Sequence, residues 1–476
     1  MKTIQICLSL GLGLALTSAA SAQASFEVID GDVITCNFDG SILLGVDSSD
    51  YFVLENGVKT YIPGSMGCTD ISDDGTVVYG QAPDPMGGLP SAAIYTASTG
   101  WALLGGLPGQ SSPANEDSSA YQISGDGATA VGLGWRTNFT ARGFRWRAGT
   151  GLLELPQMGP NSSRASAVSR DGMWIGGFDE APNGPRRAAL WDENFNEVLL
   201  LIGVTTDGIG EVNGLNSDGS VACGAAASQG FVWNPGDGAV TFGPFPGFDS
   251  NRAFATSDDG EVVVGNATTF PFNRLATIWT PSSGNQGLKD VLIANGANIG
   301  ASLGLEFALG ISEDGQTIVG RGFDPASGFF GFRAFLPRCG TTESFCSSTP
   351  NSSGGPAIMD SNGMTSIGAN GFSIEVDSVP NDTGLFFYSL GQAAGGSGTP
   401  FGNGLLCIGG GESVTRLAPQ VATGNANSNA LDFTALPPNS PPVLAGDVWN
   451  FQYWFRDPGV GASFDTSDGL AVSWCP

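Results

Sequence analysis

One short phrase returns seven times in this chain: Ser or Asn, any residue, Asp-Gly, four residues and Gly. The seven Asp-Gly pairs are Asp39-Gly40, Asp74-Gly75, Asp126-Gly127, Asp171-Gly172, Asp218-Gly219, Asp259-Gly260 and Asp314-Gly315. A single Asp-Gly pair is a common hairpin turn, but seven copies in register define an architecture. Each copy predicts two antiparallel strands joined by a tight turn. The intervals of 35 to 55 residues leave room for two further strands per unit.

A four-stranded unit of this length is typical of one blade of a β-propeller. The last repeat has no fourth strand, because Pro337 and Arg338 follow its third strand directly. Upstream of the first repeat, residues 26–29 form an unassigned segment of alternating character. A closed ring leaves no free sheet edge, so we expect this segment to complete the last blade. The sequence therefore predicts an all-β protein that begins with a seven-bladed propeller over residues 23–338.

The texture of the chain changes after the repeats. A Cys-, Ser- and Gly-rich stretch, residues 339–355, predicts a connector, and no motif copy follows it. In Trp449–Phe455 the odd-numbered positions are all aromatic, and Asn450, Gln452 and Trp454 alternate with them. This period of two is typical of a strand with one face in a core. Residues 356–476 are therefore predicted to form a β-sandwich domain.

The repeats resemble the HAF-type extracellular repeats of bacterial secreted proteins over residues 34–338. The clearest match is Ile-Ser-Asp-Asp-Gly-Thr-Val-Val-Tyr-Gly at positions 71–80, although the histidine of the family signature is absent from every copy. The segment that follows resembles a C-terminal module of secreted proteins from environmental bacteria. That likeness is carried by Phe-Gln-Tyr-Trp-Phe-Arg-Asp-Pro at 451–458 and by the closing Ser467-Asp468 and Cys475-Pro476. The resemblances imply an extracellular protein and no particular activity.

The N-terminus and the charge predict export. Residues 1–22 read as a signal peptide, with Lys2, an apolar run too short to span a bilayer, and a small-residue cleavage site at Ala20-Ser21-Ala22. The chain has 18 basic and 45 acidic residues, a formal net charge of −27. Nucleic acids and anionic membranes demand a basic surface, so neither is an expected partner. We expect an extracellular protein with no membrane span, suited to basic partners or a cation-rich medium.

The chain contains no histidine. This excludes catalytic sets that need His and all His-ligated metal sites, and no cofactor is implied. The recurring Asp offers an alternative reading as a calcium ligand. Calcium loops gather more oxygen ligands than Ser/Asn-x-Asp-Gly supplies, so we favour a structural turn.

Seven cysteines follow the signal segment, which leaves at least one without a partner in the chain. Cys36 and Cys68 lie on the first strands of adjacent repeats, so a Cys36–Cys68 disulfide is predicted. Cys223 replaces an apolar residue of the motif and is expected to be buried and free.

Loops between second and third strands hold the most unusual residues. Trp135 and Arg136, with Arg186 and Arg274 from other repeats, form the predicted ligand-binding set, because Trp and Arg can stack on a sugar-like or flat ligand. Solvated loop charges are the plain alternative. The predicted function is a secreted, non-catalytic binding scaffold for a carbohydrate or a cell-surface partner. The alternative is a carboxylate-dependent carbohydrate-active enzyme, a glycosidase or lyase, using a pair such as Asp179 and Glu180.

Overall fold

The computed structural model describes residues 24–157, 159–182, 185–200, 210–270, 273–338, 340 and 342–474, the last range without residues 364, 366, 368, 369, 439 and 445. The predicted signal peptide, Cys339 and Cys475 lie outside the described residues. The chain divides into two compact units at Leu336/Pro337, and each is described by itself. No helix in the described part has the length and apolar character needed to cross a membrane.

The first unit consists of four-stranded antiparallel sheets, of which the described residues form seven. Six of them are each made of four consecutive strands. The first three of these sheets are β2 (Asp32–Cys36), β3 (Ile42–Val46), β4 (Tyr51–Glu55) and β5 (Val58–Ile62); β6 (Gly67–Ile71), β7 (Val77–Ala82), β8 (Ser91–Thr96) and β9 (Gly100–Leu103); and β10 (Ser118–Ile123), β11 (Thr129–Trp135), β12 (Ala141–Arg147) and β13 (Gly151–Glu154). The next three are β14 (Ser163–Val168), β15 (Ile175–Glu180), β16 (Arg186–Trp191) and β17 (Glu197–Leu200); β18 (Gly210–Leu215), β19 (Ala222–Ala226), β20 (Gln229–Asn234) and β21 (Gly238–Phe242); and β22 (Ser250–Thr256), β23 (Val263–Thr269), β24 (Asn273–Thr280) and β25 (Gly284–Gly287).

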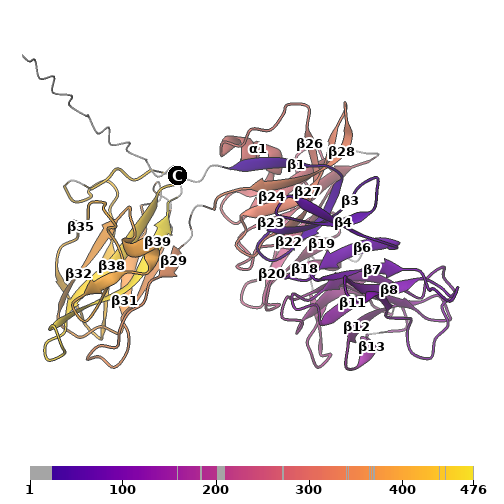
Figure 1. The fold of residues 1–476 in the computed structure, drawn as a ribbon, viewed down its shortest axis with the longest axis horizontal. Coiled ribbons are helices and arrows are strands. Elements are labelled where there is room, and N and C mark those ends of the chain that lie inside the picture. The colour runs from indigo at the N-terminus through magenta and orange to yellow at the C-terminus, as the bar shows by residue number, and fades with distance from the viewer. Residues whose placement is uncertain are drawn as a thin grey trace, which may run out of the picture. The chain divides into compact units, whose positions relative to one another are not determined.

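The remaining sheet joins the two ends of the unit. Helix α1 (Leu288–Ala294) leads into β26 (Gly304–Ile311), β27 (Thr317–Asp324) and β28 (Gly328–Phe335). Its outer strand is β1 (Ser25–Ile29), which pairs antiparallel with β28. In Figure 1 the indigo β1 lies beside these orange strands. The predicted closure of the last sheet by the N-terminal segment is confirmed.

The sheets form a closed ring. The first strand of each sheet contacts the first strand of the next, and β26 contacts β2. A hydrophobic cluster fills each space between neighbouring sheets. Successive side chains of one strand point to opposite faces of its sheet and pack in different clusters: Leu43 packs toward the preceding sheet and Leu44 toward the following one. Because both faces are buried, the second strands read as continuous apolar runs. Radial packing of four-stranded sheets around an axis is the arrangement of a β-propeller.

The second unit contains two sheets that share one core. The larger, six-stranded sheet has the order β29 (Thr342–Phe345), β39 (Phe464–Ser473), β38 (Val448–Arg456), β32 (Thr383–Ser389) and β35 (Thr415–Arg416), with β36 (Gln420–Val421) also on β32. The three-stranded sheet has the order β30 (Ile358–Asn362), β31 (Ser373–Asp377) and β37 (Ala426–Ala430). Ile374 and Val376 of the smaller sheet join Phe451 and Tyr453 of the larger in one buried cluster.

The aromatic face predicted for Trp449–Phe455 is confirmed, since its four odd-numbered residues are all buried in this cluster. The other face differs from the expected half-buried strand. Asn450 and Gln452 are also buried, beneath η1 (Ala393–Gly396) and the hairpin of β33 (Thr399–Phe401) and β34 (Gly404–Leu406). The structure also differs from the predicted connector over residues 339–355. Strand β29 lies within this segment and pairs with β39, so part of it belongs to the larger sheet.

The predicted Cys36–Cys68 disulfide is wrong: both thiols are free and buried, as is Cys223. Cys36 packs against Leu43 and Val319 in one space between sheets, whereas Cys68 packs against Leu44 in the next. Cys68 corresponds to Val33 of the first repeat, and Val33 shares the layer of Cys36. The two thiols therefore leave their strands in the same rotational sense and enter different layers. Burial raises the pKa of each of the three thiols to about 12. The prediction that Cys223 is buried and free is confirmed.

Candidate functional site

Each copy of the motif forms the turn between the first and second strands of a sheet. In the second copy the Gly75 N–H donates to the Ser72 carbonyl (3.0 Å), so Asp73 and Asp74 occupy the centre of the turn. Gly75 follows with a φ of 71°, a left-handed value that favours glycine. The sequence had placed Asp and Gly at the centre. The observed turn, with a left-handed glycine after two central residues, is a common hairpin alternative.

Two side-chain hydrogen bonds recur in every copy. The Ser or Asn side chain accepts from the N–H five residues on, as Ser72 does from Val77 (3.0 Å). The Asp carboxylate accepts from the N–H two residues on, as Asp74 does from Thr76 (2.9 Å). These bonds explain both constant residues as turn formers. The residue between them has no such role, and its side chain is available at the tip.

The first strands of the seven sheets line a central channel. Hydrogen bonds join the seven turns into a ring at one end of this channel, and each turn has one residue at its tip. The tip residues are Phe38, Asp73, Gly125, Arg170, Ser217, Asp258 and Glu313. Each turn is hydrogen-bonded to the next. Five of these bonds join backbone groups: Asp73 N to Gly125 O (2.8 Å), Gly125 N to Arg170 O (2.9 Å), Asp171 N to Ser217 O (3.1 Å), Asp258 N to Glu313 O (2.9 Å) and Glu313 N to Phe38 O (2.7 Å). The other two use a side chain: Asn37 Nδ2 donates to the Asp73 carbonyl (2.9 Å), and Ser217 N donates to Asp258 Oδ1 (2.9 Å). Each turn is therefore held by its neighbour, and the variable residues that precede the motif aspartates surround a single opening, the channel mouth.

The channel mouth carries three carboxylates and one guanidinium. Arg170 forms ion pairs with Asp73 and with Glu313 (Nε to Oε1, 2.9 Å), so its side chain lies between two sheets other than its own. Asp258 is exposed, and the Asp73 and Glu313 side chains remain 33% and 34% exposed. The mouth is thus net negative and open to solvent. Within the described ranges, no group of three or more His, Cys, Asp or Glu side chains is arranged to hold a metal ion.

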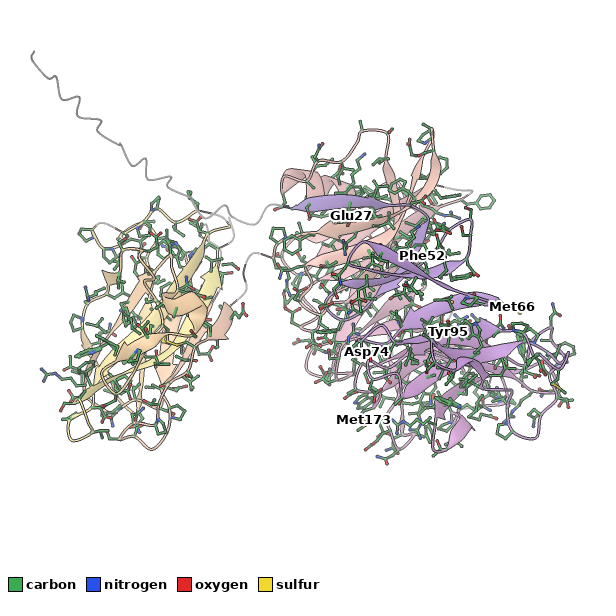
Figure 2. All side chains as sticks on the ribbon, viewed as in Figure 1. Glu27, Phe52, Met66, Asp74, Tyr95 and Met173 are labelled. Atoms are coloured by element: carbon green, nitrogen blue, oxygen red, sulfur yellow. A yellow bond between two sulfur atoms is a disulfide. The ribbon has the colours of Figure 1, made fainter. Side chains whose placement is uncertain are left out.

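Topology puts the remaining turn residues on this same face. In an antiparallel sheet of consecutive strands, the first and third turns leave at one edge and the second at the other. Figure 2 shows Asp74 and Met173, from two copies of the motif, on one side of the unit and Met66, which precedes β6, on the other. The seven motif aspartates therefore surround the channel mouth, and we call this surface the acidic face.

Behind the mouth the channel holds a cavity of about 100 Å³, lined by the first strands of the sheets. Asp70, on β6, is part of its wall and accepts a hydrogen bond from the Ile123 N–H (3.0 Å). Desolvation in the wall raises the pKa of Asp70 to about 6, against the lowering effects of backbone N–H groups and Arg170. Asp73 raises it slightly further. Asp70 is therefore a carboxyl of the channel wall that changes charge in a mildly acidic medium.

We expect Asp70→Asn to stabilise the first unit above pH 7 and to leave it unchanged near pH 4. Folding raises this pKa from 3.8 to about 6, so the stabilising proton is bound below about pH 4 and lost as pH rises through 6. The ionised group then opposes folding by about 3 kcal/mol, which the neutral amide avoids while still accepting from Ile123. Calorimetry at pH 4 and pH 8 measures the effect. Equal shifts at both pH values would contradict it.

The four residues predicted to bind a ligand lie on the opposite side of the sheets. Trp135 ends β11, and its indole N–H donates to Glu116 (3.3 Å). Arg136 forms an ion pair with Glu154. Neither residue belongs to the buried core.

Arg186 and Arg274 are held in the same manner. Arg186 is paired with Glu180 (3.1 Å), and Arg274 lies 3.8 Å from Glu306. Each guanidinium also lies over a phenylalanine ring, Phe178 at 4.2 Å or Phe307 at 5.2 Å. The predicted residues come from three sheets, and no ion pair or hydrogen bond within the described part joins one to another. An anionic ligand there would have to displace glutamates.

The carboxylates considered for glycoside hydrolysis do not face each other. Asp179 and Glu180 are successive residues of β15, so their side chains point to opposite faces of the sheet. Asp179 is fully buried, whereas Glu180 is engaged by Arg186 and by the Ser162 N–H (3.1 Å). A catalytic pair must flank one bond of the substrate, which this geometry does not permit.

The sequence predicts the Asp-Gly turns to be structural. The constant Ser or Asn, Asp and Gly form the turn, but the residue before each Asp differs from copy to copy. This variable residue is the sequence signal that points to a site. Three of those seven residues are acidic and one is Arg170. Convergence of side chains that are 35 or more residues apart in the chain is visible only in the closed ring.

Comparison with solved structures returns β-propeller proteins. The chain is similar to a putative TolB from Agrobacterium tumefaciens, with 14% identity over 66% of this chain and 99% of that one, at a TM-score of 0.34. Virginiamycin B lyase from Staphylococcus aureus has 13% identity over 66% and 100%, at 0.40. The propeller domain of the Trilobed protease from Pyrococcus furiosus has 10% identity over 56% and 96%, at 0.31. No family model matches the chain, and no curated protein does.

Proposed function

We propose that this chain is a secreted, non-catalytic binding protein in which a seven-bladed β-propeller presents its acidic face to a cationic partner, followed by a β-sandwich domain. The observation that carries the proposal is the convergence of Asp73, Asp258 and Glu313 on one channel mouth, opposed by Arg170 alone. The seven motif aspartates surround that mouth on the same face. A Lys or Arg side chain of a partner protein is the cation that this opening fits.

Charge acts here at two ranges. The net charge of −27 draws cations toward the molecule, and the acidic face concentrates that field at one place. At contact, a partner's ammonium or guanidinium group would compete with Arg170 for Asp73 and Glu313. Because exposed charges are screened within a Debye length of about 8 Å at physiological salt, affinity is expected to fall as salt rises.

Export is part of the proposal. The Cys346–Cys407 disulfide in the second unit is typical of proteins that fold in an oxidising compartment, and the N-terminal 22 residues read as a secretory signal. Carbohydrate binding through Trp135, Arg136, Arg186 and Arg274 stays a prediction. It is the weaker one, since each of the three arginines is already engaged by a glutamate.

We expect the mature protein to bind a fluorescent lysine decamer, and Asp73→Asn/Asp258→Asn/Glu313→Gln to weaken that binding about tenfold or more at low salt. The amides keep hydrogen-bonding capacity, so the ring of turns is retained. The matched control is Asp84→Asn/Asp249→Asn/Asp324→Asn, which removes the same charge from loops of the opposite face. Fluorescence anisotropy at several salt concentrations measures both.

The control triple should change affinity by less than about threefold, because its charges act only through the screened general field. Equal losses in the two triples would reduce the effect to net charge and overturn the assignment of the acidic face. Absence of binding by the unmodified protein would overturn the function itself. Circular dichroism checks that both triples remain folded.

A further inference from the structure

The outer face of the six-stranded sheet in the second unit carries a pocket that the proposed function does not use. Its volume is about 360 Å³, within the range of roughly 300–1,000 Å³ typical of small-molecule sites. Leu385, Phe387 and Trp454 form its floor, on the side of β32 and β38 that faces away from the core. The hairpin of β33 and β34 forms one wall, with Phe401 and Leu406.

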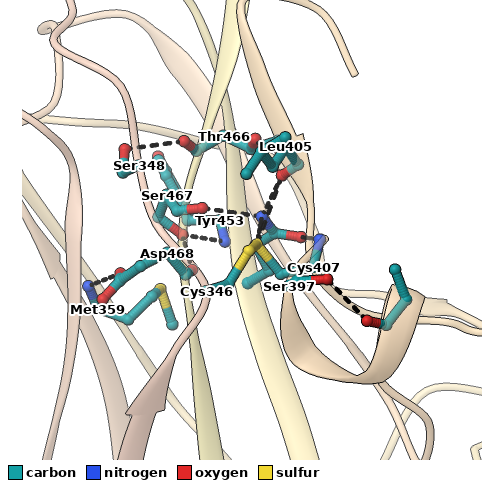
Figure 3. Close-up of a disulfide and its surroundings, with 12 residues drawn as sticks. Cys346, Ser348, Met359, Ser397, Leu405, Cys407, Tyr453, Thr466, Ser467 and Asp468 are labelled. Carbon is teal, nitrogen blue, oxygen red and sulfur yellow. Dashed lines mark hydrogen bonds between the residues drawn. A yellow bond between two sulfur atoms is a disulfide. The ribbon is translucent and has the colours of Figure 1, made fainter. Parts of the chain in front are cut away.

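The wall is held in place before any ligand arrives. The Cys346–Cys407 disulfide anchors the end of the hairpin, and Figure 3 shows it beside Leu405 and Thr466. The fully buried Gln452 donates to the Leu405 carbonyl (2.7 Å) and accepts from the Cys407 N–H (2.9 Å). The Thr466 hydroxyl donates to the same Leu405 carbonyl (2.7 Å). A wall fixed in this way loses little conformational entropy on binding, which favours affinity.

The lining defines the chemistry of the ligand. Six of the seven lining side chains are aliphatic or aromatic, and the seventh is Arg416 at the rim. A sugar needs several hydrogen-bond partners, which this lining does not offer. Aromatic rings continue beyond the pocket, since Phe464 packs 5.3 Å from Phe401 and 5.9 Å from Trp454 between ring centroids. An apolar body therefore fits the pocket.

Arg416 is a second, independent indication that the pocket binds a ligand. In this acidic chain most described arginines pair with a carboxylate or a backbone carbonyl, but no ion pair in the described part of the chain involves Arg416. Its guanidinium is exposed beside an apolar pocket. Guanidinium groups bind carboxylates through paired N–H donors. From the pocket and this free cation we infer that the second unit binds a small apolar carboxylate, with its hydrocarbon on Trp454 and Phe387 and its carboxylate on Arg416.

The test uses the full mature protein at physiological salt, titrated calorimetrically with 2-naphthoate and decanoate and with their uncharged amides. We expect the carboxylates to bind more tightly than the amides. Arg416→Gln should weaken carboxylate binding about fivefold and leave amide binding unchanged, since an exposed ion pair contributes modestly. Arg252→Gln is the matched control, because Arg252 is likewise exposed and outside every ion pair of the described residues, but belongs to the first unit.

Val414→Phe fills the rim of the pocket with an extra ring and should abolish binding while the thermal unfolding of the second unit stays unchanged. Equal affinities for carboxylates and amides, or equal effects of the two arginine variants, would overturn the role of Arg416. Binding that survives Val414→Phe in a folded protein would overturn the pocket. Failure of both carboxylates to bind at millimolar concentration would overturn the inference. None of these outcomes bears on the acidic face, which the lysine decamer tests separately.

Discussion

Deletion of residues 24–30 is expected to destabilise the first unit by about 5 kcal/mol, because it removes β1 from the closed ring. Ile29 is 4% exposed and packs with Val33 and Phe52, so its loss leaves a cavity between the last sheet and the first. Phe26 stacks on Phe332 with ring centroids 5.7 Å apart. The deletion also exposes the edge of β28, a template for aggregation.

Hydrogen exchange read by mass spectrometry localises this effect. Peptides from β26–β28 and from β2–β3 should lose protection together, because β1 is the outer strand of one sheet and packs on the other. Glu27→Gln is the control: it removes only the exposed ion pair with Arg333 and should change the unfolding free energy by less than about 1 kcal/mol. Unaltered protection in the truncated protein would show that the ring is stable without its closing strand.

Gly265→Ala is expected to destabilise the first unit by about 3 kcal/mol or more. Gly265 is the second glycine of the sixth motif copy, and a Cβ built there overlaps the Arg252 carbonyl oxygen. The obstacle is backbone, which cannot turn away as a flexible side chain does. A β-bulge between Ala253 and Ala255 lies opposite this glycine and brings the carbonyl close.

The same relation holds in every copy, where the first strand is bulged opposite the second motif glycine. Gly149→Ala is the matched control, because an added Cβ meets nothing within 4 Å and its φ is not positive. It should alter the unfolding free energy by no more than about 0.5 kcal/mol. Calorimetric unfolding of the two variants compares them. A Gly265→Ala transition that matches that of Gly149→Ala would show that the close approach relaxes at no cost.

The repeat predicted the strands because its signals are local. An Asp that accepts the N–H two residues on, and a glycine with a left-handed φ, act within one turn and need no knowledge of the rest of the chain. The second glycine was recognised as constant, but its reason lies in the bulged strand beside it. The aromatic alternation of Trp449–Phe455 likewise predicted the core face of β38, and the burial of Phe451 and Tyr453 in the cluster shared by both sheets confirms it.

The candidate sites depended on contacts that the repeat does not encode. Arg136, Arg186 and Arg274 read as free cations in loops, but glutamates from other strands engage them. The closed ring brings Arg170 to Asp73, 97 residues away along the chain. The pocket beside Arg416 depends on a hairpin that packs on the outer face of β38. The alternation of residues along β38 predicts its core face but not this hairpin.

The sequence by itself determined the all-β class, the positions of the repeated strands and the closing role of Phe26–Ile29, since these follow from turn chemistry, strand period and the need to pair an edge. Only the tertiary structure decided that Cys36 and Cys68 face different layers, that Cys346 bonds Cys407 across 61 residues, and that the variable motif residues share one mouth. The division has a physical reason. Backbone angles and nearest-neighbour hydrogen bonds are properties of short segments, whereas the partner of a side chain is settled by how whole sheets pack.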